Sequence, residues 1–401
     1  MIRSGWVYLL KVKTIILILF VAMTQLNSID NKSITRQEEK VEIEWSVAAT
    51  LPSPDGVQEQ RGLAGPVTGI IHDRLIVAGG ANFPDGMPWR GAKKAYRDEI
   101  YLFEKKNGHL VNAIVCKQRL PLPLAYCANV MTTEGLVYVG GENEKGISDR
   151  VVLMKYSEAA EKFEFSDLPS LPIPLTNLSA AYAGQKIYVA GGNSKDGTSS
   201  RFFSLDVLAP NAGWQLLPDV PVRISFTIMT VQSDEGHPCI YLIGGRRKNS
   251  NGISAIFNTV YRYNTRDSRW SQERSLPYNI SAGTGIANGT NEILVFSGDK
   301  GETFHKEEMI NVAINDEKDE QKREELVKKR IALLDAHAGF TREVLLYNTV
   351  TDTWKKLNPL PFGSVTTTAI KWGDDIIIPS GEIKAGVRTP LILMGKIAPS
   401  R

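Results

Sequence analysis

Short apolar runs that end in a pair of small residues recur along this chain. Each run is rich in Val, Ile, Leu and Tyr, which favour a pleated strand, and ends in Gly-Gly or Ser-Gly. The six copies span residues 75–80, 137–141, 187–192, 240–245, 294–298 and 376–381. Paired glycines at a strand end allow a positive φ and a close approach of neighbouring backbone. The pattern therefore predicts six repeats of one β unit.

A second mark, a Leu-Pro step, lies upstream of every run. The steps begin at residues 51, 120, 168, 217, 276 and 360. Aromatic residues precede five of them, namely Trp45, Trp214, Trp270, Trp354, and Phe163 with Phe165. Proline ends the strand pairing, and aromatic rings suit the packing between neighbouring sheets. Further strand-like segments, such as 100–103 and 260–263, lie between the marks, so each unit is expected to be a small sheet.

One small sheet cannot bury both of its faces, so such units must stack, and six of them close into a ring. The two ends of the chain fit this closure. Residues 42–47 around Trp45 form an outer strand that comes before the first inner strand, and residues 391–397 form an apolar strand after the last run. We expect the first strand to complete the last blade, which leaves no open edge at the seam.

The glycine doublet, the tryptophan and the Leu-Pro step together resemble the Kelch repeat over nearly the whole mature chain. The resemblance implies an all-β fold, a six-bladed Kelch-type β-propeller whose N-terminal strand closes the last blade. A highly charged segment with interleaved apolar residues, 306–335, predicts one or two helices inserted in the fifth blade, within an insertion at about 303–340. This insertion is either a lid over the channel or a solvated surface helix.

The first thirty residues have the order of a secretory signal. Arg3, Lys11 and Lys13 give a basic start, residues 14–22 are apolar, and residues 24–28 are polar. We predict a signal peptide over residues 1–28, one propeller domain over residues 29–401, a periplasmic location and no stable membrane insertion after cleavage. The apolar run is short for a membrane span, although an uncleaved anchor is the alternative.

Charge and cysteine content exclude several classes of protein. Removing residues 1–28 takes three positive charges from the formal +3, which leaves 0. Without a strongly basic segment, the mature chain is a poor candidate for binding nucleic acid. The three cysteines have no metal-site spacing and at most one local bridge, between Cys116 and Cys127. Stability must therefore come from an apolar core, and no metal site is predicted.

Three unusual segments follow inner strands and should share one face of the ring, because strands alternate in direction. They are residues 81–97, 299–340 and 382–390. Long loops gathered on one face of a rigid scaffold usually carry function. The last segment places Glu382, Lys384 and Arg388 around glycines near the axis. These charges are either a functional site or a structural ion pair in a turn.

The 381–389 segment resembles an element of the sialic acid mutarotases, the N-acetylneuraminate epimerases, which reads Gly-Glu-Ala-Lys-Pro-Gly-Leu-Arg-Thr. Residues 335–337 resemble their Asn-Ala-His, and residues 63–81 and 140–149 resemble further stretches. Their order differs from that in the enterobacterial enzymes, which implies a circularly permuted branch. The resemblance implies an isomerase that interconverts the α and β anomers of N-acetylneuraminate, a sugar acid. It also implies that no cofactor is needed and that the protein forms a homodimer.

The resemblance and the residue chemistry assign roles at this site. Anomerisation opens the ring and closes it again, so it needs a base for the anomeric hydroxyl and an acid for the ring oxygen. Glu382 is the candidate proton carrier, Arg388 the candidate partner of the substrate carboxylate, and His337 a proton-transfer or hydroxyl-binding group or merely a hydrogen-bonded helix histidine. Weaker substrate-binding candidates, from positions near the axis or channel mouth, are Lys384, Asn82, Glu142 and Arg223.

Other propeller functions are less compatible with the sequence. Hydrolytic sialidases carry Asp-box turns, and residues 194–197 have the wrong spacing for one. Copper radical oxidases need a Tyr–Cys crosslink and paired histidines, whereas the five histidines here are scattered. A non-catalytic Kelch module that binds a glycan or a protein partner is the alternative, since fold alone does not fix function.

Overall fold

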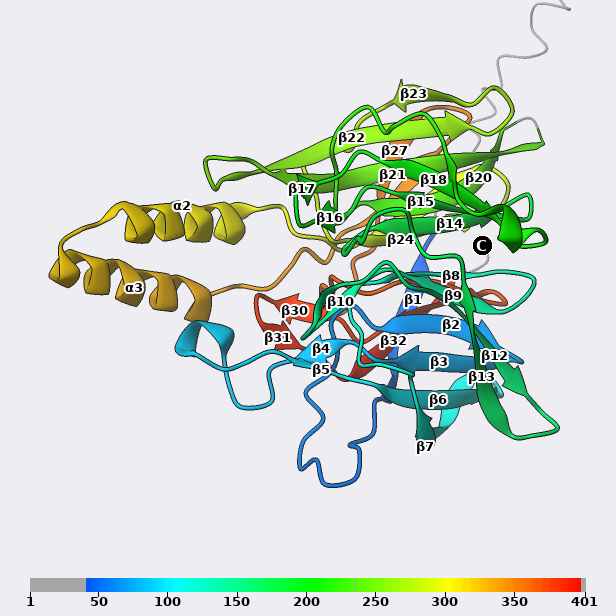
Figure 1. The fold of residues 1–401 in the computed structure, drawn as a ribbon, viewed down its shortest axis with the longest axis horizontal. Coiled ribbons are helices and arrows are strands. Elements are labelled where there is room, and N and C mark those ends of the chain that lie inside the picture. Colours follow the sequence, from blue (N-terminus) through cyan, green and yellow to red (C-terminus); the bar gives the residue numbers. More distant parts are fainter. Residues whose placement is uncertain (1–40, 235, 398–401) are drawn as a thin grey trace, which may run out of the picture. The chain divides into compact units, whose positions relative to one another are not determined.

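The computed structural model describes residues 41–234 and 236–397, so the predicted signal peptide lies outside the described residues. Six four-stranded antiparallel sheets in this part of the chain form the blades of a β-propeller (Figure 1). The predicted all-β, six-bladed fold is therefore confirmed. In the described part of the chain, neither α-helix is long and apolar enough to cross a membrane.

The blades follow one another along the chain. Blade 1 comprises β2 (Val67–Ile71), β3 (Arg74–Ala78), β6 (Glu99–Lys106) and β7 (His109–Arg119). Blade 2 comprises β8 (Ala128–Met131), β9 (Leu136–Val139), β12 (Val151–Ser157) and β13 (Lys162–Leu168). Blade 3 comprises β14 (Ser179–Ala183), β15 (Lys186–Ala190), β18 (Phe202–Asp206) and β19 (Gln215–Leu216). Blade 4 comprises β20 (Ile228–Asp234), β21 (His237–Lys248), β22 (Ser254–Asn264) and β23 (Arg269–Glu273). Blade 5 comprises β24 (Thr284–Asn288), β25 (Glu292–Phe296), β26 (Val344–Asn348) and β27 (Thr353–Leu357). Blade 6 comprises β28 (Ile370–Trp372), β29 (Asp375–Pro379), β32 (Leu391–Ile397) and β1 (Ile43–Thr50).

The first strand closes the last blade, as predicted. β1 pairs antiparallel with β32, with Ile43 opposite Ile397 and Thr50 opposite Leu391. The outer edge of blade 6 is thus made by the start of the described chain. This pairing joins the two ends of the ring without a covalent bond and removes an unpaired edge.

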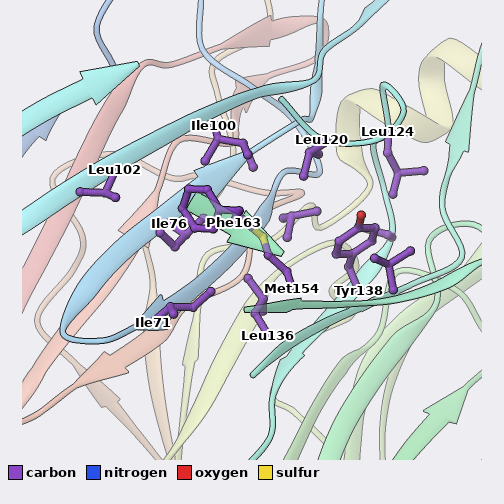
Figure 2. Close-up of a cluster of buried hydrophobic side chains, with 14 residues drawn as sticks. Ile71, Ile76, Ile100, Leu102, Leu120, Leu124, Leu136, Tyr138, Met154 and Phe163 are labelled. Atoms are coloured by element: carbon purple, nitrogen blue, oxygen red, sulfur yellow. The ribbon is translucent and has the colours of Figure 1, made fainter. Parts of the chain in front are cut away.

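The apolar core lies mainly between neighbouring blades. Figure 2 shows one such cluster, in which Ile76, Ile100 and Leu102 of blade 1 meet Leu136, Met154 and Phe163 of blade 2. Met154 is fully buried. Each large side chain buried in this way stabilises the fold by about 1.5–3 kcal/mol. All three cysteine thiols are free, so no Cys116–Cys127 bridge is formed.

Two of the recurrent tryptophans are hydrogen-bonded to Leu-Pro steps. The Trp214 indole N–H donates to the carbonyl of Pro169 at 2.8 Å, and that of Trp270 donates to Pro218 at 2.9 Å. Each bond joins the outer strand of one blade to the Leu-Pro step that precedes that blade. In these two blades the sequence marks are hydrogen-bonded partners, whereas the Trp354 indole donates to the carbonyl of Arg274 at 3.0 Å.

The glycine doublets are required by backbone contact at the inner end of each blade. Gly191, for example, has φ +64°, and a Cβ there would lie 2.2 Å from the carbonyl oxygen of Ile224 in the next blade connection. A side chain would clash with main chain that cannot move away. In blade 6 the first glycine is replaced by Ser380, whose Oγ accepts from Leu63 N–H at 2.8 Å and donates to the carbonyl of Thr389 at 2.7 Å.

A closed ring of backbone hydrogen bonds surrounds the axis. Six residues, one per blade connection, have φ between 53° and 62°, and each donates its N–H to the carbonyl of the next around the ring at 2.7–3.0 Å. They are Gly65, Tyr126, Asn177, Phe226, Ala282 and Thr366. Members of this ring line both the central channel and the cavities described below, so the ring is the floor of the candidate site.

The insertions after the inner strands lie on one face, as predicted (Figure 1). Four of them form small hairpins: β4 (Ala81–Asn82) with β5 (Ala95–Tyr96), β10 (Glu142–Asn143) with β11 (Gly146–Ile147), β16 (Asn193–Ser194) with β17 (Gly197–Thr198), and β30 (Glu382–Lys384) with β31 (Val387–Arg388). In blade 5 the insertion is a helical arm, formed by α2 (Glu302–Asp316) and α3 (Glu320–Asp335), which confirms the predicted helices. Short 3-10 turns occur at Pro88–Arg90 and Pro210–Ala212.

Candidate active site

Two adjoining cavities lie where the insertions of blades 1, 5 and 6 converge. The first cavity, of about 350 Å³, is lined by Phe83, Pro88, Trp89, Lys94, Tyr126, Glu307, Arg330, Leu334, Glu382, Ala385, Gly386 and Arg388. The second cavity, of about 210 Å³, shares part of this wall and extends toward Arg246 and His337. Concave sites with a few convergent charges are the usual form of small-ligand sites.

The β30–β31 hairpin places Glu382 and Arg388 side by side. The two residues are register partners, and Nη2 of Arg388 lies 3.0 Å from Oε2 of Glu382. The Gly386 N–H donates to Oε1 of Glu382 at 3.2 Å, from the turn of the hairpin. Burial raises the pKa of Glu382, and the Arg388 guanidinium acts against that rise. Glu382 is therefore a carboxyl group whose proton affinity is increased at a cavity wall, which is what a proton carrier needs.

Arg388 is buried and only partly satisfied. Its side chain is 4% exposed, and Nη2 also donates to the Tyr126 hydroxyl at 3.2 Å. The guanidinium lies over the Phe83 ring, 4.6 Å from its centroid. Within the described residues, Nε and Nη1 of Arg388 are buried without a hydrogen-bond partner. Such donors are costly to leave unpaired, so they favour an anionic ligand at this position.

The second cavity contains another arginine. The Arg246 guanidinium lies between two aromatic rings, 3.9 Å from the Phe226 centroid and 4.4 Å from that of Phe304. Phe226 belongs to the backbone ring and Phe304 to α2, so this stack joins the arm to the propeller. These cation–π contacts help to hold the guanidinium at the cavity wall.

His337 lines the second cavity, just after α3. The Gly339 N–H donates to its Nδ1 at 2.9 Å, which leaves the ring proton on Nε2. Burial lowers the pKa of His337, so the ring is neutral at pH 7. His337 is thus suited to donate a hydrogen bond from Nε2 rather than to act as a strong acid.

A model of the N-acetylneuraminate epimerase family matches residues 23–161 and 168–401. The chain belongs to this family. It is 28% identical over 231 residues to an N-acetylneuraminate epimerase of Haemophilus influenzae (strain 86-028NP), and 30% identical over 231 residues to one of Vibrio vulnificus (strain YJ016). These matches cover 57% and 55% of this chain and 59% and 57% of the relatives, so the chain spans under two thirds of the relatives' length.

A solved structure supports the fold alone. The structure of YjhT matches with a TM-score of 0.59 at 13% identity, over 87% of this chain and 97% of that chain. At this identity the likeness concerns the propeller and not the chemistry of the site.

The remaining residues predicted from the sequence lie outside the two cavities. Asn82 is buried and satisfied, because its amide donates to Gly62 O at 3.1 Å and accepts from Arg97 Nε at 3.3 Å. Its side chain lines a different cavity, beside Tyr101. Asn82 is one residue past the position that corresponds to Glu382, and successive strand residues point to opposite sides.

Glu142, Lys384 and Arg223 also have other surroundings. Glu142 accepts from the Tyr96 hydroxyl at 2.7 Å and lies 3.3 Å from Nζ of Lys94, so it positions a residue that lines the first cavity. Lys384 is half-buried on β30 and Arg223 is exposed, and neither lines the two cavities. Glu382, Arg388 and His337 thus line the two cavities, and the four weaker candidates do not.

The cavity residues that the sequence reasoning missed include Arg246 and Glu307. Arg246 directly follows the doublet in blade 4, and therefore corresponds to Glu382 of blade 6, as the equivalent bridges of both residues show. That repeat position was a usable signal. Glu307 lies in the charge run of α2, where no sequence pattern separates it from the neighbouring carboxylates. No group of three or more His, Cys, Asp or Glu in the described residues is arranged to hold a metal ion.

Proposed function

We propose that this protein is a mutarotase that interconverts the α and β anomers of N-acetylneuraminate by opening and closing the sugar ring. The observation that carries the proposal is the buried Arg388, whose Nε and Nη1 have no partner in the described residues and which lies beside the carboxyl group of Glu382. A substrate that has a carboxylate on its anomeric carbon would meet both groups at once. Membership of the N-acetylneuraminate epimerase family supports the same substrate.

The chemistry requires only proton transfers. In the proposed reaction Glu382 takes the proton of the anomeric hydroxyl, the bond from the anomeric carbon to the ring oxygen breaks, and that oxygen receives a proton. Rotation of the open keto acid presents the other face of the carbonyl, and the reverse steps close the ring. Because protons taken and given are equal in number, no cofactor is required, and acid–base groups of this kind typically accelerate such steps about 10²–10⁴-fold.

The surroundings of Glu382 suit substrate orientation. Arg388 would hold the substrate carboxylate through Nε and Nη1, with the Phe83 ring behind the guanidinium. The neutral His337, with its proton on Nε2, would donate to a hydroxyl of the sugar from the second cavity. Substrate orientation and proton transfer would then come from the hairpin and from the end of the arm.

Three further expectations are part of this proposal. The order of residues 1–28 supports export and a periplasmic location. Family precedent supports a homodimer. A circularly permuted chain order would explain why collinear matches to named relatives cover only 55–57% of this chain, since one alignment can follow only one of the two exchanged segments.

The alternative is a Kelch module that binds a sugar acid without converting it. Glu382→Gln distinguishes the two functions, because it keeps the size of the side chain and removes its ability to take a proton. Calorimetry with N-acetylneuraminate and a rate measurement are made on the same preparations. A mutarotase predicts binding within about 5-fold of wild type and a rate lower by about 10²-fold or more. A wild-type protein that binds the sugar and does not speed its anomerisation would be a binding module.

A further inference from the structure

Three residues line both cavities: Glu307, Glu382 and Ala385. Glu382 and Ala385 come from the β30–β31 hairpin, whereas Glu307 comes from α2 of the arm. The junction of the cavities is therefore bounded by two carboxyl groups from separate elements, one on the propeller and one on the arm. A ligand that contacts Glu382 at this junction also lies beside Glu307.

The arm directs Glu307 to the junction and uses its neighbour for anchoring. Glu308 accepts from the N–H and the hydroxyl of Ser254 on β22, at 2.8 and 2.6 Å. Glu307 instead accepts from the side chain of Asn311. Nη1 of Arg330 donates to Oδ1 of Asn311 at 2.9 Å, which orients the amide N–H groups toward Glu307. Adjacent glutamates thus have different tasks, and Glu307 is the one that faces the cavities.

Both helices of the arm are fixed to the propeller, so Glu307 has a defined position. At the end of α3, Asp335 accepts from the Trp89 indole at 2.8 Å and pairs with Arg90 at 2.5 Å. The Glu308–Ser254 bonds hold α2 in the same way. Anchoring gives the carboxyl group the fixed position that acid–base catalysis requires.

The charges around the two carboxyl groups differ. Burial raises the pKa of Glu382, and the nearby cations Arg388, Arg246 and Lys94 oppose that rise. For Glu307, burial raises the pKa first, and the adjacent Glu308 adds to that rise against Arg330. One group is therefore surrounded by three cations while the other has a like charge next to it. Burial nevertheless raises the pKa of both carboxyl groups, so their roles follow from geometry: Arg388 would hold the carboxylate of the anomeric carbon beside Glu382, which leaves the ring oxygen for Glu307.

We propose that Glu307 is the second acid–base residue of the reaction and protonates the ring oxygen while Glu382 deprotonates the anomeric hydroxyl. The inference rests on the proposed function. On opening, the anomeric proton moves to Glu382, the carbon–oxygen bond breaks with its electron pair on the ring oxygen, and that oxygen takes the proton of Glu307. On closing, each proton returns and both residues regain their starting forms. His337 is a poorer acid for this step because it is neutral, and Gly339 occupies its Nδ1.

The test compares Glu307→Gln with a control variant, Glu325→Gln, which removes an exposed carboxylate of α3. The rate of anomerisation of N-acetylneuraminate, the Kd for the sugar and the melting temperature are measured for each. We expect Glu307→Gln to lower kcat about 10²-fold or more, to change Kd less than about 3-fold and to melt like wild type. Glu325→Gln should match wild type in all three.

A pH profile separates catalysis from a structural role. Wild-type kcat/KM should fall as pH rises through the raised pKa of Glu307, because the acid form is then lost. In Glu307→Gln the residual rate should lack that fall. Wild type and variant share the other titratable or charged groups around the junction. These are Glu308, Arg330, Glu382, Arg388, Arg246, Lys94, Tyr126, Asp299, Lys384 and His337.

The outcomes distinguish the two proposals. If the rate of Glu307→Gln stays within about 3-fold of wild type while Glu382→Gln is inactive, the role of Glu307 is overturned and the mutarotase function stands. The role of Glu307 is also overturned if Glu307→Gln weakens sugar binding and lowers kcat by equal factors and leaves the pH profile unchanged, because Glu307 would then only shape the cavity. A wild-type protein without any effect on anomerisation overturns the function itself, and the inference with it.

Discussion

Replacing Arg388 by lysine tests how the site recognises its substrate. Lysine keeps the positive charge beside Glu382 but lacks the planar fork of donors. In the structure two guanidinium nitrogens, Nε and Nη1, are buried and have no hydrogen-bond partner in the described residues. A hydrogen bond that involves a charged group contributes about 1.5–3 kcal/mol, so two of them contribute about 3–6 kcal/mol. If the lysine ammonium recovers one of these hydrogen bonds, the expected loss is that of the other, about 1.5–3 kcal/mol.

A loss of about 1.5–3 kcal/mol corresponds to affinity weakened about 10–100-fold, since 1.4 kcal/mol is tenfold. We expect Arg388→Lys to raise the Kd and the KM for N-acetylneuraminate by this factor while kcat falls less than about 10-fold. Titration calorimetry gives Kd, and anomerisation rates over a range of substrate concentrations give KM. Arg201→Lys is a suitable control, because Arg201 is an exposed residue paired with Asp219 at the surface.

A Kd for Arg388→Lys within about 3-fold of wild type would refute the reasoning. It would mean that the two buried nitrogens do not contact the substrate, and that Arg388 serves only to pair with Glu382. The same result for Arg201→Lys is expected and confirms that loss of an arginine at the surface has no effect of its own.

Three other predictions concern the fold. Gly191→Ala should lower the free energy of unfolding by at least about 2 kcal/mol, because Gly191 has a positive φ and lies against neighbouring backbone. Gly184 has a positive φ but open space around it, so Gly184→Ala should lower the free energy by only about 1 kcal/mol. Chemical denaturation measures both values, and equal losses would contradict the steric argument. Burial alone would raise the pKa of Glu343, but hydrogen bonds from two lysines and a tyrosine outweigh burial and lower the pKa to about 2. The stability that Glu343 contributes should therefore be present above its unfolded pKa of about 4.5 and be lost as pH falls toward 2. A Glu343→Gln variant should lose less stability over that pH range. Asp335→Ala removes the hydrogen bond to Trp89, so it should loosen the arm and raise KM several-fold. The readout is faster hydrogen exchange over residues 320–335. Unchanged exchange would show that other contacts hold the arm.

The propeller was predictable from the sequence because its contacts repeat. The glycine doublets recur where each blade must approach the next connection, and Trp214 and Trp270 recur with the prolines to which they donate. The closure by β1 was also predictable, since an outer strand without preceding inner strands has one place to pair. Each of these features is a local pattern with one structural solution.

The site was predictable where the hairpin is local, and less so where distant elements meet. Glu382 and Arg388 are six residues apart in one hairpin, so their meeting follows from the turn. The position of Glu307 depends on how the arm docks, and a charge run alone does not indicate which carboxylate faces inward. Asn82 was predicted as a substrate-binding residue but lies one residue past the strand position that faces the site. Its side chain is therefore a buried amide with hydrogen-bond partners.

The central claim is that this protein speeds the anomerisation of N-acetylneuraminate. Proton NMR on freshly released α-N-acetylneuraminate, recorded with and without catalytic amounts of the mature protein, tests it most directly. We expect the α signal to decay faster with wild-type protein than without it, and Glu382→Gln to match the spontaneous decay. An unchanged decay with saturating wild-type protein would contradict the account.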